Sequence, residues 1–136
     1  MADWQGYLRQ AHRFWEGAEA AHDPEHASQA VSNAILAAIA ANDAVCLYLL
    51  GEVSGSGSHA EAARHLQTAC KGTRWEREAA THARQFAQIL REKNAAQYEG
   101  RPLAPETADR IMTQARRFLD WVERVLPPLP LSPTDA

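Results

Sequence analysis

The residues best suited to chemistry lie in one short segment late in the chain, from Arg91 to Tyr98. Arg91, Asn94 and Tyr98 fall on one face of a helix, because three and four residues separate them. The cation on such a face can hold a phosphate, and the tyrosine ring can stack on a base. Lys93 adds a second cation and Gln97 a second amide. The segment is a candidate phosphate-binding or base-stacking site; the alternative is that Tyr98 seats the helix end and Arg91 is solvated.

A carboxylate inside an apolar helix is the second feature that needs a partner. Asp43 shares a helical face with three apolar side chains, those of Ile39, Cys46 and Leu47. A buried carboxylate cannot stay charged without a cation or several hydrogen-bond donors. Lys93 continues the apolar stripe of a later helix and points partly inward, so we expect it to be the buried polar partner of Asp43.

A metal site is a weaker hypothesis. One short stretch gathers four side chains that could bind a metal, those of His22, Asp23, Glu25 and His26. Glu19 and His22 have the spacing of half a di-iron carboxylate signature, but the second half is missing. Pro24 also places the group at a surface turn. We therefore expect no metal and no cofactor, and keep a metal-binding helical-bundle enzyme as an alternative.

Charge is distributed unevenly along the chain. The net charge is −3, yet residues 71–101 carry seven basic and four acidic residues, whereas residues 1–70 carry three and eight. A local excess of positive charge can meet phosphates, although it is more often a solvated helix face. Residues 71–101 are thus a candidate nucleic-acid surface only if this face is exposed.

Apolar periodicity predicts helices throughout the chain and no strand. The expected helices cover residues 4–22, 58–70, 73–98 and 105–126, and a further one begins between residues 25 and 28 and runs to residue 50. Their start signals are Asp3, the Ser58/Glu61 and Thr73/Glu76 capping pairs, and Pro105. The 27 alanines favour helices packed at close range. We predict an all-α fold, an antiparallel up-and-down four-helix bundle with one additional short helix. One domain spans residues 1–126, and residues 127–136 form a Pro-rich tail that we expect to be disordered.

The second predicted helix is apolar on nearly every face. Burying it requires neighbours on all sides, more than three helices provide, so we expect part of it to face a second copy in a homodimer. Its run from Ala34 to Leu50 is 17 residues long and interrupted by Asn42 and Asp43, which argues against a membrane span. We expect a cytoplasmic protein with two reduced, structural cysteines.

The order of these features resembles the short, stand-alone HEPN domains of bacteria. The shared features are an aromatic first helix, the run AAIAANDA at residues 37–44, a Gly/Ser turn before a His-containing helix, and the pattern Leu90, Lys93, Ala96, Tyr98. The resemblance covers residues 4–125. It implies a HEPN-like bundle, commonly dimeric, found both as metal-independent ribonucleases of toxin–antitoxin and defence systems and as non-catalytic relatives. Some members have a nucleotidyltransferase as an operon partner.

Active members of that family carry an R-x(4–6)-H motif late in the helix before the final one. The arginine stabilises phosphate charge in the transition state, and the imidazole moves a proton to or from the ribose 2′-oxygen. The matching segment here, Arg91 to Tyr98, contains no histidine. Gln97 cannot titrate, and tyrosine has a reference pKa of about 10. The segment keeps its cations but lacks an acid/base group.

A second match to this spacing lies earlier, at Arg77 and His82. It falls in the first half of the predicted helix, and such pairs arise easily by chance in a chain with six histidines. Dimerisation could still bring two copies of the pair together. We therefore predict a non-catalytic HEPN-like binding module for RNA, nucleotide phosphates or a toxin–antitoxin or defence partner. The main alternative is a metal-independent ribonuclease that uses Arg77 and His82.

Overall fold

A computed structural model of the chain contains five α-helices and, in the residues it describes, no strand. It describes residues 3–21, 26–53, 59–98 and 103–130, the side chains at positions 59 and 93–98 excepted. The helices are α1 (Trp4–Ala20), α2 (Ala27–Leu50), α3 (His59–Cys70), α4 (Glu76–Tyr98) and α5 (Pro105–Val125). The predicted all-α class is confirmed, and each helix lies within a few residues of its expected bounds.

Local signals set several of these bounds. Asp3 caps α1 by accepting the backbone N–H of Gln5 on Oδ1 at 2.9 Å. Pro105 is the first residue of α5, where no intrahelical bond needs its missing N–H. Gly51 ends α2 with φ of 82°, in the left-handed region, and its N–H donates to the Leu47 carbonyl at 2.9 Å. The start of α1 and the start of α5 follow the predicted signals.

In the turn between α3 and α4, the predicted capping pair Thr73/Glu76 accepts hydrogen bonds from backbone N–H groups other than those of a capping box. Thr73 Oγ1 accepts the N–H of Trp75 at 3.1 Å, whereas Glu76 accepts the N–H of Gly72 at 3.3 Å instead of that of Thr73. Gly72 adopts φ of 81°, a conformation that a residue without Cβ takes without strain. Ser58, the other predicted cap, lies outside the described residues.

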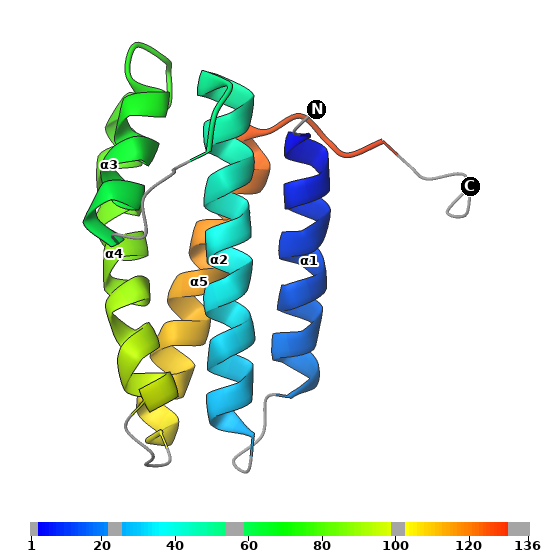
Figure 1. Cartoon of the computed structure of the whole chain (residues 1–136), viewed down its shortest axis with the longest axis vertical. Coiled ribbons are helices and arrows are strands. Elements are labelled where there is room, and N and C mark those ends of the chain that lie inside the picture. Colours follow the sequence, from blue (N-terminus) through cyan, green and yellow to red (C-terminus); the bar gives the residue numbers. More distant parts are fainter. Residues whose placement is uncertain (1–2, 22–25, 54–58, 99–102, 131–136) are drawn as a thin grey trace.

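Helix α2 occupies the centre of the arrangement (Figure 1). α1 packs along one side of it, α3 and α4 lie on the other side, and α5 packs behind it against α2 and α4. α1 and α4 run in one direction and α2 and α5 in the other. This central position explains why α2 carries apolar residues around most of its circumference.

Small residues let α2 pack closely on its neighbours. Seven of its alanines are buried: Ala30, Ala34, Ala37, Ala38, Ala40, Ala41 and Ala44. A Cβ at Gly17 of α1 would lie 3.2 Å from Asn33 Nδ2 of α2, so the α1–α2 contact is also close. The larger core side chains come from α4 and α5, where the rings of Phe86 and Phe118 stack with centroids 5.0 Å apart. α2 is therefore the helix on which the bulkier helices assemble.

The length and composition of α2 would also suit a membrane span. More than half of its most apolar stretch is buried inside the domain, as in the core helix of a globular protein. Asn42 is its fully buried polar residue, with 1% of its surface exposed, whereas the neighbouring Asp43 is half-buried. Asn42 Oδ1 has no hydrogen-bond partner in the described part of the chain.

Candidate nucleic-acid interface on α4

Three arginines line the solvent-facing side of α4. Arg77, Arg84 and Arg91 recur every seven residues, close to two full helical turns, and all three are exposed. Successive members are about 10.5 Å apart along the helix axis. Thr81 and Gln88, also exposed, occupy the same face between them. We term Arg77, Arg84 and Arg91 the arginine stripe.

The charge of the arginine stripe is not compensated. Within the described residues none of its three members pairs with an acid, whereas ion pairs engage Arg64, Arg110, Arg116 and Arg124. A free guanidinium can donate two parallel hydrogen bonds to a phosphate, which gives both affinity and orientation. The exposed face of α4 therefore has the chemistry of a phosphate-binding surface.

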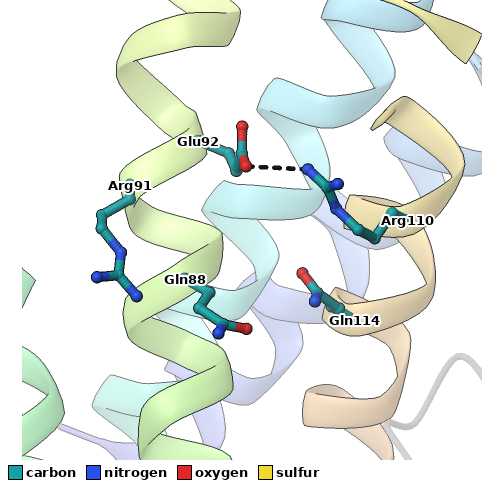
Figure 2. Close-up of a pocket in the computed structure, with 5 residues that line it drawn as sticks. All are labelled: Gln88, Arg91, Glu92, Arg110 and Gln114. Carbon is teal, nitrogen blue, oxygen red and sulfur yellow. Dashed lines mark hydrogen bonds and ion pairs between the residues drawn. The ribbon is translucent and has the colours of Figure 1, made fainter. Parts of the chain in front are cut away.

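A polar hollow lies beside the stripe, between α4 and α5 (Figure 2). It has a volume of about 430 Å³ and is lined by Gln88, Arg91, Glu92, Arg110 and Gln114. Arg110 Nη2 donates to Glu92 Oε1 at 3.0 Å, so these two charges neutralise each other. Gln88 and Gln114 project from the two facing helices. We term this space the α4–α5 hollow.

A second hollow lies on the other flank of the stripe, between α3 and α4. Its volume is about 420 Å³, and it is lined by Arg64, Gln67, Thr68, Lys71, Glu76 and Ala80. Arg64 pairs with Glu61 on its own helix, and Glu76 caps the preceding turn. The stripe is thus a ridge with a hollow on each side.

His82 does not belong to the stripe. It lies five residues after Arg77, about 140° further around the helix, and faces α5. Its imidazole stacks on the Trp121 indole with ring centroids 4.5 Å apart. Burial lowers the pKa of His82, an effect that Gln85 and Glu78 only partly offset. Within one chain, the structure does not bring the Arg77 and His82 side chains together.

Buried polar atoms lie between α4 and α5 near His82. His82 Nδ1, Gln85 Oε1 and Trp121 Nε1 are buried and form no hydrogen bond of normal geometry in the described part. Further along the same two helices, Arg124 and Glu78 form an ion pair at 3.8 Å. The α4–α5 contact therefore contains buried polar groups near His82 as well as the stacked rings of Phe86 and Phe118.

Asp43 lies apart from this surface, on α2. Desolvation raises the pKa of Asp43 to about 6, and the positive charge of His65 on α3 opposes part of that shift. Lys93, the expected partner, has its side chain outside the described part, so His65 is the basic group that the structure relates to Asp43. Desolvation also raises the pKa of Cys46 to about 12 and that of Cys70 to about 11, so both thiols stay protonated.

Several predicted site residues are not among the residues or side chains that the structure describes. Of the five candidate binding residues in the segment, Arg91 alone has a described side chain; the other four are Lys93, Asn94, Gln97 and Tyr98. In the proposed metal group His26 is described and exposed, and the members outside are His22, Asp23 and Glu25. Among the described residues, no three His, Cys, Asp or Glu side chains converge on a metal site.

The family motif does not single out Arg84, Gln88 or Gln114. The seven-residue spacing of the three arginines is visible in the sequence and marks a single helical face. No sequence pattern marks the two glutamines, because they face each other only as a result of the packing of α4 against α5.

No known protein family matches the chain, and no curated protein is significantly similar to it in sequence. The functional assignment therefore rests on the geometry of α4 and its two flanking hollows.

Proposed function

We propose that this chain is a non-catalytic, HEPN-like four-helix bundle module that binds single-stranded RNA through its phosphates. The observation that carries the proposal is the arginine stripe, whose three exposed guanidiniums pair with no acid among the described residues. The four long helices, α1, α2, α4 and α5, alternate in direction along the chain, which is consistent with such a bundle.

Phosphate binding follows from the local charge of the stripe. Each phosphate that an arginine neutralises releases condensed counterions, which favours binding at low salt. The chain as a whole carries a net charge of −3, so attraction to RNA must come from this one face and not from the molecule at large. Binding should accordingly be weak, sensitive to salt and confined to α4 and its flanks.

The absence of catalysis follows from the placement of the imidazole. A general acid or base must lie within hydrogen-bond reach of the proton it moves. His82 is stacked on Trp121 on the side of α4 that faces α5, and its lowered pKa keeps it neutral at pH 7. Gln97, in the segment that matches the family motif, cannot titrate. A ribonuclease that uses Arg77 and His82 is the alternative, and it would need a second copy to complete the site.

Fluorescence anisotropy with a short labelled single-stranded RNA tests the proposal. Arg84→Ala combined with Arg91→Ala should weaken binding by at least about tenfold, since it removes two charged hydrogen-bond donors. A matched control, Arg116→Ala with Arg124→Ala, removes the same charge from arginines that already pair with acids. The control should bind like the wild type. Equal losses in both proteins would mean that only net charge matters, which would contradict the proposal.

We also propose that a second copy of the chain covers one face of α2. Only one of its 24 residues is charged, the half-buried Asp43, which lies on the same face as the apolar residues named next. Leu36, Ile39 and Leu47 lie on one face of the helix and remain half-buried, and Tyr48 and Leu50 at its end are exposed. Partly exposed apolar side chains gathered on one helix face favour association. A dimer would carry two stripes, so one long strand could engage both.

A further inference from the structure

The α4–α5 hollow presents two amides that have no partner within the described chain. Gln88 of α4 and Gln114 of α5 point into the space between the helices (Figure 2), and neither forms a hydrogen bond with a described residue. Glu92 and Arg110, which line the same space, are engaged with each other at 3.0 Å. Apart from Arg91 of the stripe, the free hydrogen-bonding groups of the hollow are therefore these two amides.

Two amides on opposite walls match adenine better than any other base. A glutamine amide binds adenine bidentately, because Oε1 accepts from N6 and Nε2 donates to N7. Adenine has a second, equivalent edge, since the other N6 hydrogen lies beside the N1 acceptor. Uracil has O4 beside a single N3–H and offers one such edge. Guanine is read by arginine and cytosine by a carboxylate; Arg110 and Glu92 are already paired with each other, and Arg91, the remaining arginine of the hollow, is assigned to a phosphate.

We propose that the α4–α5 hollow is an adenine-binding site for the RNA strand held by the arginine stripe. The inference rests on the proposed function, because Arg91 belongs both to the stripe and to the lining of the hollow. Arg91 follows Gln88 by about one helical turn, so a base next to a phosphate on Arg91 can reach the hollow. The volume of about 430 Å³ lies within the range of small-molecule sites.

The test compares oligo(A) and oligo(U) of equal length by fluorescence anisotropy at one low salt concentration. The wild type should bind oligo(A) about fivefold or more tightly than oligo(U), the lower end of the discrimination given by one bidentate pair. Gln114→Ala and, separately, Gln88→Ala should reduce this preference while oligo(U) affinity stays unchanged. Gln67→Ala, which removes an amide from the hollow on the α3 side, is the matched control and should keep the preference.

The outcomes separate the two proposals. Equal affinity of the wild type for both strands, with binding still weakened in the Arg84/Arg91 double variant, would overturn the adenine site and leave RNA binding by the stripe intact. Full preference in both the Gln114→Ala and Gln88→Ala proteins would overturn it as well. Failure of the wild type to bind either strand would refute the proposed function and the adenine site together.

Discussion

The imidazole of His82 lies nearly parallel to the indole of Trp121, with 4.5 Å between ring centroids and 16° between ring planes. The contact joins α4 to α5 and turns the imidazole away from the arginine stripe on the opposite side of α4. The histidine with the spacing of a catalytic residue therefore packs between two helices. Its position separates the candidate acid/base group from the surface that is suited to phosphate.

His82 should make the protein less stable in acid. Because burial lowers its pKa below the ordinary value of 6.5, the unfolded state binds more protons than the folded state in that range. The free energy of unfolding should therefore fall as the pH drops below about 6.5. Urea denaturation of wild type and His82→Phe between about pH 5 and pH 7.5 measures this, and the variant should show a shallower decline. Identical declines would contradict burial of a neutral imidazole.

Asp43 should have the opposite effect. Its pKa is raised from 3.8 to about 6, so the folded state binds the proton more tightly and the free energy of unfolding falls as the pH rises through this interval. Asp43→Asn removes the desolvated charge and should stabilise the protein at pH 8 but not at pH 4. Glu16→Gln, at an exposed position of α1, controls for the change in net charge. Destabilisation by Asp43→Asn at pH 8 would instead indicate a carboxylate well paired with His65 or Lys93.

A single substitution in the stripe should change the salt dependence of RNA binding by a fixed amount. Each phosphate contact on a single strand contributes about −0.7 to the slope of log K against log salt concentration. Arg84→Ala should therefore make the slope shallower by about 0.7 for every RNA sequence. Arg124→Ala, whose guanidinium lies 3.8 Å from the Glu78 carboxylate, should leave the slope unchanged. An unaltered slope in Arg84→Ala would mean that this side chain contacts no phosphate.

The apolar face of α2 should hold two copies of the chain together. Light scattering on the eluting peak of a sizing column should give twice the 15.0 kDa mass of one chain. Ile39→Glu, which adds a second carboxylate beside Asp43 on the half-buried face, should yield monomers, whereas Gln10→Glu at an exposed site of α1 should not. A wild-type mass of 15.0 kDa at micromolar concentration would rule out the dimer.

Helix bounds could be predicted because their signals are local. Asp3 and Pro105 act on the residues beside them, so each start is encoded where it occurs. The burial of individual α2 residues is harder to predict. Apolar residues surround both Asn42 and Asp43 in the sequence, so the local pattern does not distinguish them. Only the packing of four neighbouring helices decides that Asn42 is buried and that Asp43 is half-exposed.

The candidate site depends on contacts between helices and was harder to predict. The helical period places Arg77 and His82 on different sides of α4. Which of these sides faces solvent depends on where α3 and α5 pack. The stacking of His82 on Trp121 and the facing amides of Gln88 and Gln114 join residues far apart in the chain. No periodicity within either helix encodes these pairs.

Binding without cleavage is tested most directly by following one RNA sample in two ways. End-labelled single-stranded RNA is incubated with the wild-type protein and EDTA, and the mixture is divided between a native and a denaturing gel. We expect a retarded complex in the native gel and full-length RNA in the denaturing gel. Shortened RNA that disappears with His82→Ala would contradict this account and identify Arg77 and His82 as the active site.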